Sequence, residues 1–166
     1  AEVLTDFPML NSSLDQGLEK IVIKNYVNMG IAVDTPEGLI VPNIKNVQEK
    51  SIMNIAEEIA ILASAAKTRK LKIPDLKGAS FTISSLGAIG GKFFTPIINP
   101  AEVVILGLSK TLPKVVAKKE ECESREFLPL SLSYDHRVIN GVYAAQFVTQ
   151  LGAALGDTSL MEKKFK

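Results

Sequence analysis

The sequence predicts an α+β domain in which a mixed β-sheet and a layer of helices pack on each other. Short segments rich in β-branched residues outnumber the helical segments, and tight turns join several of them as in antiparallel hairpins. Two long amphipathic segments have apolar residues three or four positions apart and can cover one face of the sheet. With 166 residues, 46% of them hydrophobic, the chain has the size and apolar content of one compact domain.

The first strands are expected between residues 19 and 44, where β-branched residues alternate with polar ones. The alternation is interrupted at Asn28 and again from Thr35 to Gly38, where a proline and a glycine are placed for a hairpin turn. Later strands are expected at 80–86, 103–109, 114–118 and 127–135. The charged run 119–126 is interpreted as a solvated turn between the last two of them.

The two helices are expected after residue 51 and after residue 140. Ser51 has the position and the side chain of an N-cap for the first helix. This helix should end near Leu71, because Pro74 disfavours helical backbone just before it. The second helix is expected to begin at Gly141, and the last six residues, 161–166, are expected to fray or to lie over a neighbouring subunit.

Composition excludes several classes of function. The net charge of +1 gives no field that favours nucleic acid or an anionic membrane as a partner. Cys122 is the only cysteine, so neither a disulfide framework nor a multi-cysteine metal site is expected. No stretch reaches the roughly 18 apolar residues that a membrane span requires. A cytoplasmic protein without a metal centre is therefore expected.

His136 is the only histidine and lies between a predicted strand and a predicted helix. An imidazole with a pKa near 6.5 takes and returns a proton at neutral pH without special tuning. A lone histidine is often structural, but the end of a strand places a side chain at the edge of the sheet. Gly141 is expected to let the backbone turn tightly beside it. The flanking Asp135 and Arg137 are expected to brace this loop through an ion pair.

Hydroxyl groups lie where the predicted strand 80–86 meets a glycine-rich loop. A hydroxyl here could donate a hydrogen bond to a developing oxyanion, although two serines before Leu-Gly are also ordinary turn residues. The loop that follows, 87–102, is long for a compact domain, and such loops are usually functional. Cys122 has three glutamates around it, which disfavour a thiolate, so it is expected to be a surface residue.

Residues 131–148 resemble the C-terminal signature of the dihydrolipoamide acyltransferases, which is Asp-His-Arg, two apolar residues, Asp or Asn, and Gly. The resemblance continues through 30–47 and 77–110, in the right order over nearly the whole chain, and is strongest to bacterial pyruvate-type members. It implies a chloramphenicol acetyltransferase-like fold. It also implies that residues 1–166 are an acyltransferase catalytic core lacking the N-terminal part of the domain, with no lipoyl or peripheral-subunit-binding domain.

The same resemblance implies the transfer of an acetyl group between dihydrolipoamide and coenzyme A. His136 would be the general base that removes the proton from the attacking thiol. Ser84, supplied by a neighbouring subunit, would stabilise the oxyanion of the tetrahedral intermediate. Asn140 stands where many members of the family have Asp. Coenzyme A would be a co-substrate, and the lipoyl group would be an acyl carrier on a domain absent from this chain.

The resemblance further implies homotrimers that pair into a larger hollow core. Lipoyl domains, a 2-oxo acid decarboxylase and dihydrolipoamide dehydrogenase would be its partners. Three alternatives remain open at this point. The chain could be a catalytically incomplete scaffold, or it could transfer a succinyl or branched-chain acyl group. A chloramphenicol-type transfer to a hydroxyl is disfavoured by the Asp-His-Arg triplet at 135–137.

Overall fold

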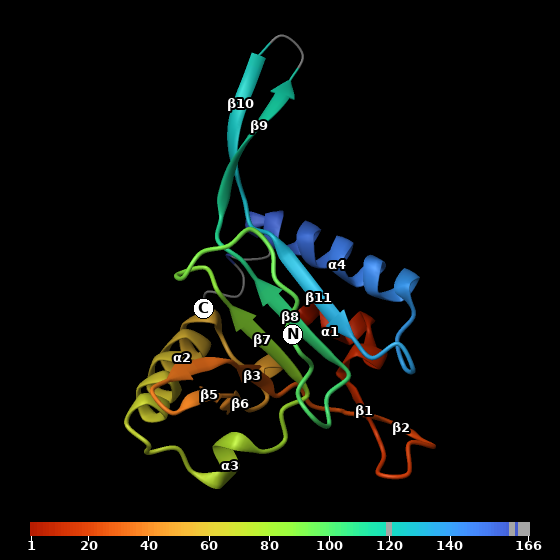
Figure 1. Ribbon diagram of the computed structural model, residues 1–166. Coiled ribbons are helices and arrows are strands. Elements are labelled where there is room, and N and C mark those ends of the chain that lie inside the picture. Colours follow the sequence, from red (N-terminus) through yellow and green to blue (C-terminus); the bar gives the residue numbers. More distant parts are fainter. Residues whose placement is uncertain (119–120, 160–161, 163–166) are drawn as a thin grey trace.

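The computed structural model describes residues 1–118, 121–159 and 162. Its centre is a five-stranded sheet with the spatial order β11-β8-β7-β3-β6 (Figure 1). β3, β7 and β8 run parallel, while β11 and β6 are antiparallel to their neighbours. The predicted mixed sheet is therefore confirmed. The strands are β3 (Met29–Ile31), β6 (Asn43–Ile44), β7 (Phe81–Ser85), β8 (Val104–Leu108) and β11 (Leu130–Tyr134).

Two long helices meet the same face of this sheet, as the sequence predicts. Phe81 of β7 and Leu106 of β8 belong to a core cluster that Phe147 joins from the second helix. Ile55 of the first helix packs against the same cluster. The result is a two-layer α+β arrangement. The helices are α2 (Ile52–Lys67) and α4 (Gly141–Gly156).

A short N-terminal segment that the sequence did not single out also belongs to this helical layer. Val3 and Leu4 are buried, and the ring of Phe7 lies 5.1 Å from the ring of Tyr143 and 5.5 Å from that of Phe147. These contacts hold the segment against α4. The segment consists of α1 (Glu2–Asp6) and the 3-10 helix η1 (Pro8–Asn11).

α2 begins as predicted and ends earlier than predicted. The Ser51 hydroxyl accepts a hydrogen bond from the Asn54 backbone N–H at 3.2 Å, which makes it the N-cap. At the other end Arg69 adopts φ +57°, and the N–H of Lys70 donates to the carbonyl of Ala65 at 2.8 Å. This is a Schellman motif, which ends the helix at residue 67 rather than near residue 71. The sequence did not reveal it, because the left-handed position holds an arginine instead of the usual glycine.

In the part of the chain that the structure describes, three antiparallel pairs stand outside the central sheet. The pair β4–β5 has the predicted hairpin turn, in which Thr35 lies opposite Gly38 and the glycine has φ +119°. The pair β1–β2 follows η1. The remaining short elements are the 3-10 helix η2 and α3, and Pro74 stands in the first turn of α3. Their bounds are β1 (Ser12–Leu14), β2 (Ile21–Ile23), β4 (Val33–Thr35), β5 (Gly38–Ile40), η2 (Val47–Glu49) and α3 (Ile73–Leu76).

The third pair, β9 (Leu112–Lys118) and β10 (Glu121–Phe127), forms a long arm that projects from the body of the domain (Figure 1). The expectation of a charged turn over 119–126 is therefore wrong, since most of this run is strand. A ribbon with solvent on both faces needs no apolar alternation, so its sequence resembles a loop. Cys122 is exposed on this arm, as predicted. Residues 119–120 and most of the tail 161–166 lie outside the described residues.

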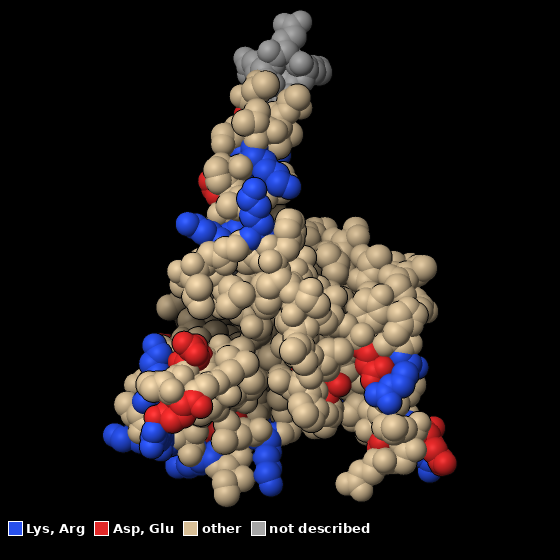
Figure 2. Space-filling view, viewed as in Figure 1, with Lys and Arg blue, Asp and Glu red and all other residues tan. Residues whose placement is uncertain are grey.

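Charged side chains of both signs are interspersed on the visible face. They lie over the corner formed by α2 and α3, around the β1–β2 hairpin and on the arm (Figure 2). The surface between these groups is largely uncharged in this view. Within the described part of the chain, no helix is long and apolar enough to cross a membrane.

Candidate active site

His136 lies in a turn between β11 and α4 whose backbone is closed by hydrogen bonds. The N–H of Asp135 donates to the carbonyl of Val103 at 2.8 Å, which extends the pairing of β11 with β8 by one residue. The carbonyl of Asp135 then accepts from the N–H groups of Val138 and Ile139, at 3.0 and 2.9 Å. Ile139 is buried, and His136 is left exposed at the outside of the turn.

Asp135 and Arg137 form the predicted ion pair on either side of the histidine. Arg137 Nε donates to both carboxylate oxygens, at 2.9 and 3.1 Å, and Nη2 donates to Oδ2 at 2.5 Å. Asp135 Oδ1 also accepts from the Arg137 backbone N–H at 3.0 Å. Hydrogen bonds from Arg137 hold the pKa of the Asp135 carboxyl below its usual range. The carboxylate of Asp135 and the guanidinium of Arg137 therefore pair with each other. This pairing holds the turn and leaves the His136 imidazole available to other partners.

Among the described residues, the His136 imidazole has one close aromatic neighbour. Its ring centroid lies 5.7 Å from that of Tyr134, with the ring planes inclined by 44°. Within the described residues neither imidazole nitrogen has a hydrogen-bond partner, so both can face a substrate. The expected tight backbone turn at Gly141 is wrong, because Gly141 is the first residue of α4 and has no positive φ. The carbonyl of Asp135 closes the turn instead.

Asn140, the other catalytic residue predicted in this region, is the N-cap of α4. Its Oδ1 accepts a hydrogen bond from the Tyr143 backbone N–H at 2.9 Å. This satisfies one of the free donors at the start of the helix. The side-chain Nδ2 has no partner among the described residues, and the residue is exposed. One end of the amide therefore stabilises the helix, while the other end is free beside the turn of His136.

Ser84 lies near the C-terminal end of β7, half-buried, where it pairs with Gly107 of β8. Its hydroxyl has no hydrogen-bond partner among the residues described. The neighbouring Ser85 is exposed and turns its Oγ toward the Gly87 N–H at 3.5 Å. The loop 87–102 passes over Gly107, since a Cβ there would lie 2.8 Å from Phe94 Cζ. The free hydroxyl of Ser84 thus lies beside the wall that this loop forms.

The structure does not bring Ser84 and His136 together within one chain. Ser84 is level with Gly107, whereas Tyr134 is level with Val104 at the other end of β8. His136 lies beyond Tyr134, and β11 is two strands away from β7. With about 3.3 Å per residue along a strand and about 4.8 Å between strands, the two side chains are separated by roughly 15 Å or more. One active site that uses both residues requires two copies of the chain.

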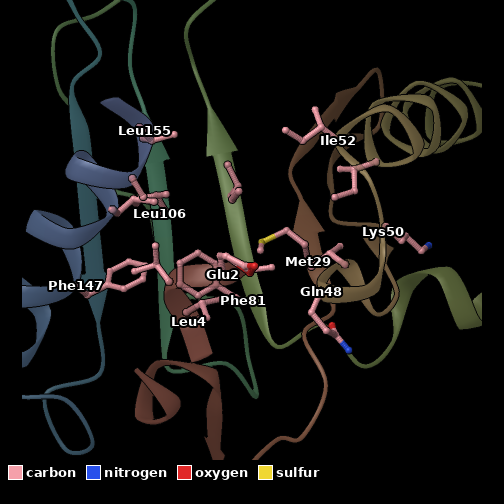
Figure 3. A pocket seen from close by; sticks show the side chains of 17 residues that line it. Glu2, Leu4, Met29, Gln48, Lys50, Ile52, Phe81, Leu106, Phe147 and Leu155 are labelled. Atoms are coloured by element: carbon pink, nitrogen blue, oxygen red, sulfur yellow. The ribbon is translucent and has the colours of Figure 1, made fainter. Parts of the chain in front are cut away.

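An apolar cavity of about 280 Å³ lies on the helical side of the sheet, between α2 and α4 (Figure 3). Met29, Phe81, Leu106 and Phe147 are among its lining residues, and none of the three predicted site residues reaches it. Across the described ranges, no three His, Cys, Asp or Glu side chains gather in a way that would hold a metal ion. The candidate site is therefore at the ends of the sheet and not in this cavity.

A polar cluster on the opposite face of the sheet was not predicted. Thr82 of β7 hydrogen-bonds to Glu102 at 2.9 Å and to Asn99 at 3.0 Å. Burial raises the pKa of the Glu102 carboxyl, against the opposing effects of these two neighbours and of the Lys24 charge. An Asn-Pro turn leading to a glutamate directly before an apolar strand is the sequence signal that was available for it.

Comparison with known protein families identifies the family to which this chain belongs. Residues 1–162 match the model of the 2-oxoacid dehydrogenases acyltransferase (catalytic domain) family. The chain belongs to this family. A relative from Buchnera aphidicola, the dihydrolipoyllysine-residue acetyltransferase component of the pyruvate dehydrogenase complex, is 49% identical over 157 residues. These cover 95% of this chain and 40% of the relative, so the acyltransferase chain spans less than half of that protein.

Solved structures agree with this family assignment. The chain superimposes on a dihydrolipoamide acetyltransferase from Azotobacter vinelandii with a TM-score of 0.92 and 49% identity, over 96% of this chain and 65% of the other. The cubic core of a pyruvate dehydrogenase multienzyme complex gives a TM-score of 0.92 at 50% identity, over 96% and 65% of the two chains. A chloramphenicol acetyltransferase, with a TM-score of 0.60 at 12% identity over 92% and 72%, shares the fold of this acyltransferase family.

Proposed function

We propose that this chain is the catalytic core of a dihydrolipoamide acetyltransferase and moves an acetyl group between dihydrolipoamide and coenzyme A. One observation carries the proposal. A serine, a histidine and an asparagine are the subject of a study of the catalytic mechanism of the Azotobacter vinelandii relative. There the histidine follows the serine by 52 positions and the asparagine follows the histidine by four. Ser84, His136 and Asn140 have these same spacings.

His136 is the general base in this proposal. Its exposed imidazole removes the proton from the thiol of coenzyme A, and the sulfur attacks the thioester carbonyl of acetyl-dihydrolipoamide. The bond from carbon to the dihydrolipoamide sulfur then breaks, and the proton passes from the imidazolium to the leaving thiolate. One thioester replaces another of similar energy, so no covalent acyl residue on the protein is needed. General base catalysis of this kind contributes about 10²- to 10⁴-fold in rate.

Ser84 would stabilise the tetrahedral intermediate between these two steps. Its hydroxyl is unused among the described residues and stands near the end of β7, in the central sheet, so it can donate to the oxyanion. A single donor of this kind is typically worth about 10²- to 10³-fold. Asn140, four positions after His136, has a free amide Nδ2 on the same turn. We assign it to holding a substrate group or water beside the imidazole.

The reaction requires two copies of the chain, because Ser84 and His136 lie at opposite ends of one sheet. We propose that residues 1–166 form the catalytic core and assemble as trimers, in which the end of β7 of one copy faces the turn after β11 of the next. The cubic core formed by a relative of 50% identity supports such an assembly. The lipoyl group would arrive on a separate domain, and the decarboxylase and dihydrolipoamide dehydrogenase would be partners of the full complex.

Acetyl transfer from acetyl-coenzyme A to free dihydrolipoamide tests the proposal, with the size of the assembly determined by light scattering in the same buffer. His136→Ala should lower the rate about 10²-fold or more without changing the size of the assembly. Ser84→Ala should lower it by about 10² or more, with Ser85→Ala as the matched control because that hydroxyl faces the loop. An unchanged rate in His136→Ala would show that the base is wrong. An intact assembly without turnover would identify a scaffold.

A further inference from the structure

Residues 99–102 form a turn that stores backbone strain. The N–H of Glu102 donates to the carbonyl of Asn99 at 3.1 Å, which closes four residues with Pro100 second and Ala101 third. Ala101 has φ +68°, a conformation that the third position of a type II turn normally reserves for glycine. Strain of this kind persists only where surrounding contacts hold it, and it tends to gather near functional sites.

The contacts that hold this turn come from one buried hydroxyl. Thr82 Oγ1 donates to Glu102 Oε1 at 2.9 Å and accepts from Asn99 Nδ2 at 3.0 Å, so both ends of the turn bind the same atom. Thr82 is fully buried. On the neighbouring strand β3, a Cβ on Gly30 would lie 2.4 Å from Thr82 Oγ1, so only glycine leaves room for the hydroxyl at this position.

The electrostatics of the cluster also carry a cost. Glu102 Oε2 is buried without a hydrogen-bond partner among the described residues. Lys24, the charged group that faces Glu102, is itself half-buried, and its Nζ donates to the carbonyl of Ala79 at 3.3 Å. Burying a carboxyl group that is only partly hydrogen-bonded has an unfavourable desolvation free energy, which an apolar contact at the same place would avoid.

The position of the cluster relates it to Ser84. Thr82 and Ser84 are two residues apart on β7, so their side chains lie on the same face of the sheet. The loop that ends in this turn crosses that face, and Phe94 lies against Gly107, the β8 partner of Ser84. The turn at 99–102 therefore anchors one end of the loop to β7, while the middle of the loop lies beside Ser84.

We propose that Thr82, clasped by Asn99 and Glu102, is a positioning residue that fixes the Ser84 hydroxyl and the loop beside it for oxyanion stabilisation. The inference rests on the proposed acetyltransferase function and adds to it a support for one catalytic group. If the clasp is lost, the loop 87–102 detaches from β7 and the wall beside Ser84 moves. A misplacement of about 1 Å at such a site is enough to cost roughly 10²-fold in rate.

The test compares Thr82→Val, which removes the hydroxyl at nearly constant shape, with Thr82→Ser, which keeps it. In acetyl transfer, Thr82→Val should lower kcat at least about 10-fold with KM for both thiols little changed. Thr82→Ser should stay near the wild-type rate. In a Ser84→Ala background, Thr82→Val should cause no further loss, because the group that it positions is already gone.

An equal loss from Thr82→Val in the Ser84 and the Ser84→Ala backgrounds would overturn the inference and leave the proposed function intact. A Ser84→Ala variant that keeps the wild-type rate would instead refute the catalytic role of Ser84 itself. Hydrogen exchange provides a readout that is independent of turnover. Amides of 87–102 should exchange faster in Thr82→Val than in Thr82→Ser, and equal rates would contradict the clasp. If Thr82→Val does not fold, Asn99→Ala takes its place in both measurements, because it removes one of the two hydrogen bonds to Thr82.

Discussion

Ser84 and His136 stand toward opposite ends of the same central sheet. Ser84 is level with Gly107, and Tyr134, two residues before His136, is level with Val104 on the same strand β8. Rotation of a side chain cannot close a separation of roughly 15 Å. If both residues act on one thioester, the interface between two copies of the chain is part of the active site.

Asn140 caps α4 and has a proposed role in acetyl transfer, and substitution can separate the two. Asn140→Ala removes the N-cap of α4 and should lower the free energy of unfolding by about 1 kcal/mol, as measured by urea denaturation. Asn140→Ser keeps a capping oxygen but has no amide Nδ2, so it should preserve stability and still reduce acetyl transfer. Full activity in Asn140→Ser would reduce the role of this residue to capping.

Gly107 allows the loop 87–102 to approach the sheet. A Cβ at this position would lie 2.8 Å from Phe94 Cζ and 3.3 Å from Pro96 Cδ, so Gly107→Ala must displace the loop or the strand. Overpacking of this kind costs about 1 to 3 kcal/mol, and the displaced wall beside Ser84 should slow acetyl transfer as well. Gly152→Ala, where a Cβ meets nothing within 4 Å, is the matched control. Equal stability of the two variants would contradict the close packing.

The Asp135–Arg137 pair predicts an acid-side dependence of stability. Because hydrogen bonds from Arg137 lower the pKa of Asp135 in the folded protein, the folded state favours the carboxylate. The contribution is present above the ordinary pKa of an aspartate, about 3.9, and is lost as the pH falls through the lower folded value. Unfolding measured from pH 6 downward should show a smaller loss of stability for Asp135→Asn. Parallel curves for both proteins would refute this.

The contribution of Glu102 to stability should change with pH in the opposite direction. Burial raises its pKa in the folded protein, so the folded state binds the proton more tightly than the unfolded state and stability falls as the pH rises through this range. Glu102→Gln keeps an acceptor for Thr82 without the charge. Its free energy of unfolding relative to wild type should therefore increase from pH 4 to pH 7. A difference that stays constant or decreases would show that the carboxylate is better satisfied than its unpaired Oε2 indicates.

The sequence predicts those elements that local chemistry determines. Ser51 caps α2 and Gly38 completes the β4–β5 turn, because both effects depend on neighbouring residues. The end of α2 at Arg69 and the strand β10 were not predicted, since a left-handed arginine and a solvated ribbon leave no distinctive pattern. The Schellman hydrogen bonds and the pairing with β9 are visible only in three dimensions.

In the candidate site, too, the sequence indicates what local motifs determine and does not indicate what depends on the three-dimensional arrangement. His136 is indicated by being the only histidine, at a junction between a strand and a helix, and the resemblance to the acyltransferase family adds Ser84 and Asn140. The Asn-Pro turn before Glu102 is a local signal, but the hydrogen bond between Glu102 and Thr82 joins side chains twenty positions apart, which a local pattern does not reveal. The separation of Ser84 from His136 likewise follows from the order of the strands, which the sequence does not specify.

The most direct test of the account mixes two inactive variants. His136→Ala and Ser84→Ala are unfolded together at equal concentrations, refolded together and assayed for acetyl transfer from acetyl-coenzyme A to dihydrolipoamide. If each site takes one residue from each of two copies, random assembly should restore about a quarter of the wild-type rate. The two variants refolded separately and then combined serve as the control. Activity no higher than that of the single variants, in assemblies of unchanged size, would contradict a site shared between two copies of the chain.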